Sequence, residues 1–84
     1  MTRVLFFGRV SDAAGCGEMK ADVPKDVRTV GALRRWLASR DDTLAAIILA
    51  PSVRAAVDRA FCRDDTASID GAEEIAFMSP LSGG

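Results

Sequence analysis

The sequence predicts an α+β fold in which one principal helix covers one face of a mixed β-sheet of four to five strands. Three patterns carry this prediction: an apolar, β-branched and aromatic run at Val4–Phe7, an amphipathic helical pattern after Thr29, and a return to short strand patterns after Pro51. With 84 residues the chain forms a single domain with a thin core. We place this domain at residues 1–80, followed by a flexible tail at residues 81–84.

The first two strands are predicted from composition and alternation. Val4–Phe7 is typical of a strand, and Glu18–Val23 alternates polar and apolar residues as a half-buried strand does, until Pro24 ends it. Between them, Ser11–Gly15 indicates a turn or a single helical turn. We therefore expect the two strands to form a hairpin.

The principal helix follows Thr29, a residue type that caps helix N-termini well. Its apolar positions recur at helical spacing over about three turns: Val30, Leu33, Trp36 and Leu37. Three arginines fall between or beyond these positions: Arg34, Arg35 and Arg40. A second short helix is expected at Leu44–Leu49, capped by Thr43 and closed by Pro51.

The second half of the chain predicts two short strands at Arg54–Val57 and Ala60–Cys62, joined by a tight turn at Asp58 and Arg59. The last strand is Glu74–Met78, and Pro80 ends it because proline has no N–H to donate to a sheet. Two strands, a principal helix and further short strands are the order of a ubiquitin-like, or β-grasp, roll.

Strand alternation separates an inner from an outer face of this sheet. The inner face receives Val4, Phe6, Ile75 and Phe77. The outer face receives Leu5, Phe7, Glu74, Ala76 and Met78, joined by Phe61 from the middle strands. Contiguous apolar patches on small monomers indicate a partner, so outward Phe7, Phe61 and Met78 predict a stable protein interface. The alternative is that a second small core or a loop covers them.

Composition argues against several classes of function. Eleven basic and twelve acidic residues leave a net charge of −1, which gives no support to nucleic-acid binding. The chain has no histidine, so a His-based catalytic triad is excluded. The apolar run Leu44–Ala50 is far shorter than a membrane span, and the N-terminal run is too short for a signal peptide. These features predict a cytoplasmic protein that binds no metal or cofactor itself.

Two cysteines, Cys16 and Cys62, stand far apart with no CxxC spacing. We interpret them as reduced thiols that act as small apolar residues. The alternative is a redox or sulfur-relay thiol.

The last residues carry the candidate chemistry. Gly83 and Gly84 have no Cβ, so they can thread a channel that excludes other side chains. Four extended residues, from Leu81 through Ser82 to Gly84, reach roughly 13 Å. The terminal carboxylate is ionised and is a poor electrophile, so it needs activation, most simply by adenylation. A sulfur nucleophile would then give a thiocarboxylate, and an amine an isopeptide bond. The plain alternative is an ordinary frayed terminus.

Four segments of the sequence resemble the MoaD family of sulfur-carrier subunits, within the wider MoaD/ThiS ubiquitin-like group. These are Val4–Gly8, Thr29–Arg34, Ala56–Asp58 and Phe77–Gly84, which span nearly the whole chain. The chain departs from the family pattern at five positions: Ser11 for a basic residue, Gly31 for Glu, Asp58 for Asn, Met78 for an aromatic and Ser79 for Pro.

The resemblance implies a sulfur-donating subunit of molybdopterin synthase that is no enzyme on its own. A MoeB-like, E1-type enzyme would use ATP to adenylate Gly84. A sulfur donor of the cysteine desulfurase or rhodanese type would then convert Gly84 to a thiocarboxylate, a 1-thioglycine. The tail would enter a MoaE-like large subunit and pass sulfur to cyclic pyranopterin monophosphate, building the molybdopterin dithiolene. Two copies of each subunit would form a heterotetramer, with Phe7, Phe61, Met78 and Pro80 at the interface.

Three alternatives stay open. A ThiS-type carrier for thiazole synthesis shares the fold and the Gly-Gly ending. A ubiquitin-like modifier would be joined to lysines through the same carboxylate. A plain binding module would make no chemical use of its tail.

Overall fold

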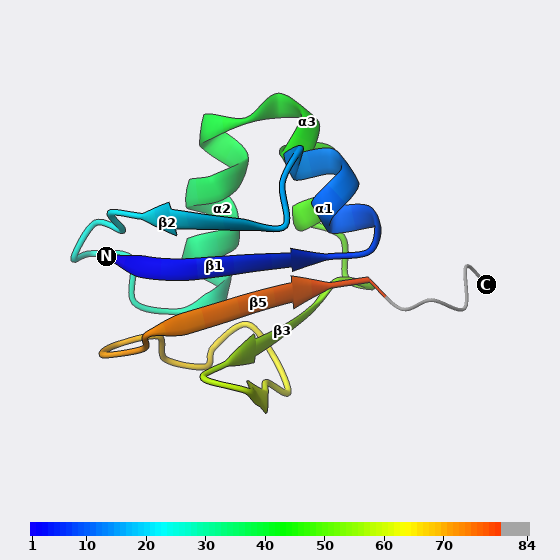
Figure 1. Cartoon of the computed structure of the whole chain (residues 1–84). Coiled ribbons are helices and arrows are strands. Elements are labelled where there is room, and N and C mark those ends of the chain that lie inside the picture. Colours follow the sequence, from blue (N-terminus) through cyan, green and yellow to red (C-terminus); the bar gives the residue numbers. More distant parts are fainter. Residues whose placement is uncertain (80–84) are drawn as a thin grey trace.

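The computed structural model describes residues 1–79, and Pro80–Gly84 lie outside the described part (Figure 1). The elements in chain order are β1 (Thr2–Phe7), α1 (Arg9–Ala14), β2 (Glu18–Ala21), α2 (Val30–Arg40), α3 (Asp42–Ile48), β3 (Arg54–Val57), β4 (Ala60–Phe61) and β5 (Glu74–Met78). The principal helix is α2, as predicted, with two shorter helices beside it.

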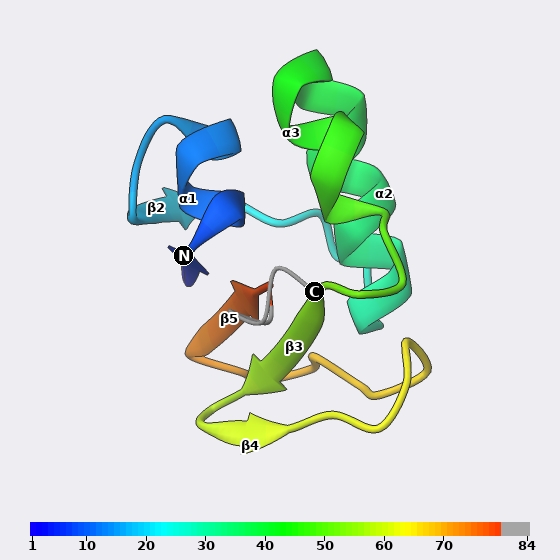
Figure 2. The ribbon, with the colours of Figure 1, turned by 90° about the vertical axis from the view of Figure 1, so that its right-hand side faces the viewer.

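The five strands form one mixed sheet in the order β2-β1-β5-β3-β4. The central pair, β1 and β5, is parallel, and the other pairs are antiparallel. The three helices lie on the same side of this sheet (Figure 1, Figure 2). The α+β fold, the mixed sheet and the principal helix on one face are therefore confirmed.

The core lies between the sheet and the helices. All four residues that alternation assigns to the inner face are almost fully buried, at 2 % exposure or less: Val4, Phe6, Ile75 and Phe77. From the helices they meet Leu33, Leu37, Leu44 and Ile48. The inner face of β1 and β5 was thus predicted correctly from period-two alternation.

Helix α2 begins as the sequence predicts. The Thr29 hydroxyl oxygen accepts a hydrogen bond from the Ala32 amide at 3.1 Å, which satisfies one of the free N–H groups of the first turn. At Gly31 the helix touches the loop between β4 and β5, where the Gly31 amide donates to the Asp65 carbonyl at 2.9 Å. A Cβ at position 31 would lie 3.1 Å from the Asp65 Cβ, so glycine permits this close approach.

The predicted cap of the second helix is wrong. Asp41, not Thr43, caps α3: its carboxylate accepts hydrogen bonds from the amides of Thr43 at 2.9 Å and Leu44 at 3.1 Å. Both residue types suit an N-cap, and they stand two positions apart. Asp41 takes the position because its extended backbone already separates α2 from α3. The helix ends at Ile48, three residues before Pro51.

The first two strands are not joined by a tight hairpin turn. They pair antiparallel, with Leu5 opposite Glu18, but α1 lies between them in the chain. The segment predicted as a turn or a single helical turn is thus the six-residue helix α1, which begins two residues earlier than predicted. Strand β2 ends at Ala21, before the predicted boundary at Val23, and β4 excludes Cys62.

The predicted turn between β3 and β4 is confirmed. Asp58 and Arg59 both adopt left-handed backbone conformations, with φ of 46° and 73°. The Asp58 carboxylate accepts hydrogen bonds from the amides of Glu73 and Glu74, each at 3.0 Å. The side chain of the turn therefore fixes the start of β5.

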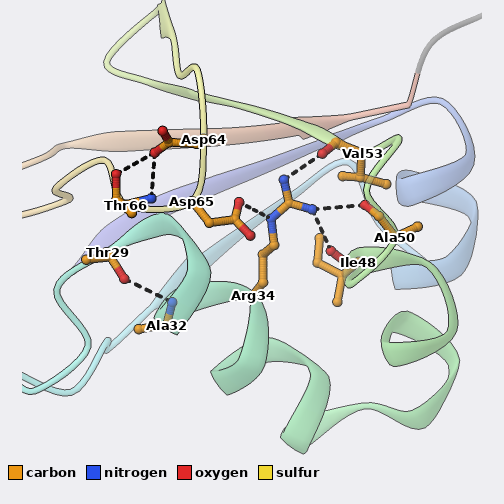
Figure 3. A network of polar contacts seen from close by, with 9 residues as sticks. All are labelled: Thr29, Ala32, Arg34, Ile48, Ala50, Val53, Asp64, Asp65 and Thr66. Carbon is orange, nitrogen blue, oxygen red and sulfur yellow. Dashed lines mark hydrogen bonds and ion pairs between the residues drawn. The ribbon is translucent and has the colours of Figure 1, made fainter.

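Arg34 is buried, although it is a charged residue in an amphipathic helix. Its Nη1 donates to the carbonyls of Ile48 at 2.9 Å and Ala50 at 3.2 Å, and its Nη2 donates to the Val53 carbonyl (Figure 3). Its Nε forms an ion pair with Asp65 at 3.1 Å without the geometry of a hydrogen bond. These contacts join α2 to the α3–β3 connection and to the β4–β5 loop.

Candidate functional site

The outer face of the sheet carries apolar residues on neighbouring strands. In strand register, Leu5 lies beside Ala76, Ala76 beside Ala56, and Ala56 beside Phe61. A second row places Phe7 beside Met78. We define the outer patch as Leu5, Phe7, Ala56, Phe61, Ala76 and Met78. No helix among residues 1–79 lies on this side of the sheet (Figure 2).

Exposure within the outer patch is uneven. Phe61 is 72 % exposed and Phe7 is 49 % exposed, whereas Met78 is half-buried. Ala76 faces outward by register but is only 6 % exposed, contrary to what its outward assignment suggested. A methyl group on a central strand is short and has strands on both sides, so it adds little accessible surface. The large side chains therefore dominate what a partner would meet.

Charged side chains border the outer patch. Arg3 pairs with Glu18 at 3.4 Å and with Glu74 at 3.6 Å at one end of the strands. At the other end, exposed Arg54 lies beside Met78 in register. An apolar centre with a charged rim is the usual anatomy of a protein interface.

The outer patch adjoins the predicted tail. Met78, the last residue of β5, pairs with Phe7, and Ser79 is the last residue that the structure describes. The remaining predicted site residues lie outside the described residues: Pro80, Leu81, Ser82, Gly83 and Gly84. Their roles stay predictions.

The two cysteines are free but differ in setting. Cys62 packs partly against the core, as a small apolar residue would, whereas Cys16 is exposed. The interpretation as a small apolar residue therefore fits Cys62 but not the exposed Cys16. Within residues 1–79, no cluster of three or more His, Cys, Asp or Glu side chains could hold a metal ion. In the same part of the chain, no helix has the length and apolar character needed to cross a membrane.

Asp64, in the loop between β4 and β5, has a shifted pKa. The pKa of Asp64 is lowered because its carboxylate accepts a hydrogen bond from the Thr66 hydroxyl and a second from the Thr66 amide. This carboxylate is exposed and lies in the β4–β5 loop, where Asp65 contacts Arg34 (Figure 3). Its two hydrogen bonds to Thr66 stabilise a turn of this loop.

Sequence comparison assigns the chain to a family. A family model described as the ThiS family matches residues 4–84. The chain belongs to the MoaD/ThiS family. A curated relative from Escherichia coli (strain K12), the molybdopterin synthase sulfur carrier subunit, is 36 % identical over 86 residues, and the match covers all of both chains.

Solved structures support the fold of this MoaD/ThiS member. The crystal structure of SAMP1 from Haloferax volcanii superposes with a TM-score of 0.79 at 19 % identity, covering 99 % of this chain and 98 % of the other. The solution structure of the Haloferax volcanii HVO 2177 protein gives a TM-score of 0.76 at 24 % identity, covering 99 % and 85 %. Together they confirm the β-grasp fold.

One contact at the site was missed from the sequence. The Arg9 amide donates a hydrogen bond to the Ser79 hydroxyl oxygen at 3.2 Å, across 70 positions of the chain. In the sequence, Ser79 stood out only as a departure from a family pattern. A serine directly after a strand gives no local signal that it will meet a distant helix.

Proposed function

We propose that this chain is the sulfur-carrier subunit of a molybdopterin synthase. The observation that carries the proposal is the full-length similarity to the Escherichia coli sulfur carrier subunit, and this chain itself ends in Gly83-Gly84. The chain supplies sulfur, and the pterin active site belongs to a MoaE-like large subunit. Two copies of each subunit form a heterotetramer in the cytoplasm.

The outer patch is the proposed contact with the large subunit. Phe7 and Phe61 offer exposed aromatic area, and Met78 lies beside Phe7 at the point where the chain leaves the sheet. Aromatic anchors of this kind contribute most of the binding energy in protein interfaces. In the proposal, Pro80 completes this contact, and Leu81, Ser82 and Gly83 thread the partner's active site.

The proposed chemistry takes place at the Gly84 carboxylate. One carboxylate oxygen attacks the α-phosphorus of ATP in a MoeB-like activating enzyme, and pyrophosphate leaves. The outer sulfur of a persulfide on a cysteine desulfurase or rhodanese-type donor then attacks the carbonyl carbon, and AMP leaves, which gives an acyl disulfide with the donor. A second thiol attacks the donor sulfur of this disulfide, forms a new disulfide with the donor and releases the thiocarboxylate. The product is the 1-thioglycine at Gly84. Its sulfur is a good nucleophile, and two such deliveries to cyclic pyranopterin monophosphate supply the dithiolene sulfurs. This chain binds no cofactor of its own.

A second candidate is a ThiS-type carrier that feeds thiazole synthesis. The observation in its favour is the description of the matching family model as the ThiS family. The same thiocarboxylate chemistry applies, so the two candidates differ in their partner. A protein modifier differs from both carriers at an earlier step, because a lysine amine, and not a sulfur nucleophile, attacks its activated carboxylate.

Intact-mass analysis after co-expression with candidate activating enzymes and sulfur donors tests the proposal. The expected product has one oxygen replaced by sulfur at the C-terminus, and it should co-purify with a MoaE-like subunit. Co-purification with a thiazole synthase instead would favour the ThiS-type candidate. Lysine conjugates with no thiocarboxylate would contradict both carriers and favour a modifier.

A further inference from the structure

The end of β5 is fastened to the start of α1. The Arg9 amide is the first N–H of this helix, and it donates to the Ser79 hydroxyl oxygen at 3.2 Å. The preceding residue, Gly8, has no side chain that could cap the helix. Ser79 therefore caps the N-terminus of α1, a role that a residue next to the helix in the sequence usually has.

Gly8 makes room for this contact. Its backbone has φ of 62° and ψ of −135°, a conformation that side-chain-bearing residues rarely adopt. A Cβ at Gly8 would lie 3.1 Å from the Ser79 Oγ. The Gly8 carbonyl also accepts a hydrogen bond from the Ser11 hydroxyl at 2.7 Å. In the turn after β1, Gly8 thus lies against Ser79 and accepts a hydrogen bond from Ser11.

This fastening lies between the outer patch and the tail. Phe7 precedes Gly8, and Met78 precedes Ser79, so the hydrogen bond follows directly on the Phe7–Met78 strand pair. Beyond Met78, where the pairing of β5 ends, this contact holds the last described residue. This contact therefore holds Ser79, the residue from which the sequence continues to residues 80–84.

We propose that Ser79 is a positioning residue: its hydrogen bond to the Arg9 amide aims the tail relative to the outer patch. The inference rests on the proposed function, in which the tail delivers the Gly84 thiocarboxylate into the partner's active site. Correct placement of a reacting group accelerates a reaction without tightening binding, and small misplacements slow it. Ser79 thus contributes to the rate of transfer within the complex, and the outer patch contributes to affinity.

Three variants of the full-length chain test this role. Ser79→Ala removes the acceptor, and Ser79→Thr keeps a hydroxyl. Ser11→Ala is the matched control. It removes a hydroxyl from the same helical turn, and among residues 1–79 this hydroxyl donates to the Gly8 carbonyl and not to Ser79. Each thiocarboxylated variant is mixed with the large subunit, and both the Kd and the single-turnover rate of sulfur transfer to cyclic pyranopterin monophosphate are measured.

We expect Ser79→Ala to slow transfer about fivefold, the population change that corresponds to one net hydrogen bond of about 1 kcal/mol. The Kd should be unchanged, Ser79→Thr should restore the rate, and Ser11→Ala should transfer at the wild-type rate. Wild-type transfer by Ser79→Ala would overturn the inference. Equal slowing by Ser11→Ala would also overturn it, because α1 stability alone would then explain the effect.

A second measurement separates this inference from the proposed function. If the wild-type chain forms no thiocarboxylate, the proposed function fails. The contact between Ser79 and Arg9 is then tested by the NMR order parameter of the backbone amide at position 79. This order parameter should fall in Ser79→Ala and stay unchanged in Ser11→Ala. An unchanged order parameter in Ser79→Ala would overturn the fastening itself.

Discussion

The guanidinium of Arg34 lies over the ring of Phe77, with 5.6 Å between its Cζ and the ring centroid. Phe77 belongs to β5, the strand that leads to the tail, and Arg34 belongs to α2. The same guanidinium donates to three main-chain carbonyls, at Ile48, Ala50 and Val53 (Figure 3). One buried cation therefore connects the principal helix, the segment before β3 and the strand that carries the tail.

Arg34→Met should lower the free energy of unfolding by about 3 kcal/mol. The acceptors are main-chain carbonyls, which the substitution cannot remove. The Ala50 carbonyl keeps its hydrogen bond from the Val53 amide, but the carbonyls of Ile48 and Val53 lose their buried donor. This differs from the replacement of both members of an ion pair, which is often neutral. Urea unfolding followed by the fluorescence of Trp36, the single tryptophan of the chain, measures the effect.

Arg35→Met is the control, since Arg35 is exposed on the next position of α2. It should change the free energy of unfolding by less than about 0.5 kcal/mol. Equal stabilities of the two variants would contradict the structural role of the Arg34 contacts.

At Asp58, two substitutions separate the contribution of the hydrogen-bond acceptor from that of the negative charge. Asp58→Asn keeps an oxygen acceptor for the Glu73 and Glu74 amides and tolerates the left-handed backbone, so stability should change by less than about 0.5 kcal/mol. Asp58→Ala loses the acceptor at the same φ and should cost about 1–2 kcal/mol. Thermal unfolding compares the two. A larger loss in the Asn variant would show that the charge, and not the acceptor, fixes the turn.

Asp64 predicts a dependence on pH. Its folded-state pKa lies below the ordinary value of 3.8, because the Thr66 hydroxyl and amide stabilise the carboxylate. Its contribution to stability is therefore fully present above the unfolded pKa and is lost as the pH falls below 3.8 through the lowered value. In Thr66→Val the pKa should rise toward 3.8, because the hydroxyl hydrogen bond is the larger cause. NMR titration of the carboxyl carbon measures it, and an unchanged pKa would contradict this cause.

The outer patch predicts a specific loss of binding. Phe7→Asp should weaken the complex with a MoaE-like subunit by about 2 kcal/mol, roughly thirtyfold in Kd, if Phe7 is a central anchor. Leu49→Asp is a matched control: Leu49 is 50 % exposed and Phe7 is 49 % exposed, but Leu49 follows α3 on the helix side. Titration calorimetry compares them. Equal weakening by both substitutions would contradict the assignment of the interface to the sheet.

Much of the fold could be predicted because its signals are local. Alternation in β1 and β5 identified the inner residues Val4, Phe6, Ile75 and Phe77, and the Thr29 hydroxyl caps α2 as its residue type suggests. The exposed Phe7 and Phe61 also followed from alternation. These features depend on neighbours within a few residues, and such neighbours are visible in sequence.

The features that were missed depend on distant partners. Arg34 can be buried because main-chain carbonyls 14 to 19 positions away accept hydrogen bonds from its guanidinium. Ser79 meets Arg9 across 70 positions, and Gly31 is required by the approach of Asp65. The cap of α3 was missed for another reason. Thr43 and Asp41 are both suitable capping residues near the same helix start, and Asp41 takes the position. The tail residues of the candidate site could be identified only from their chemistry and from a family resemblance.

The most direct test of the proposed function is molybdopterin formation by reconstituted synthase with the C-terminus altered. Wild-type chain bearing the Gly84 thiocarboxylate should convert cyclic pyranopterin monophosphate to molybdopterin when mixed with a MoaE-like subunit. Chain lacking Gly84, or carrying one added residue after it, should bind that subunit with wild-type Kd and form no molybdopterin. Molybdopterin formed at the wild-type rate by the chain without Gly84 would contradict the account.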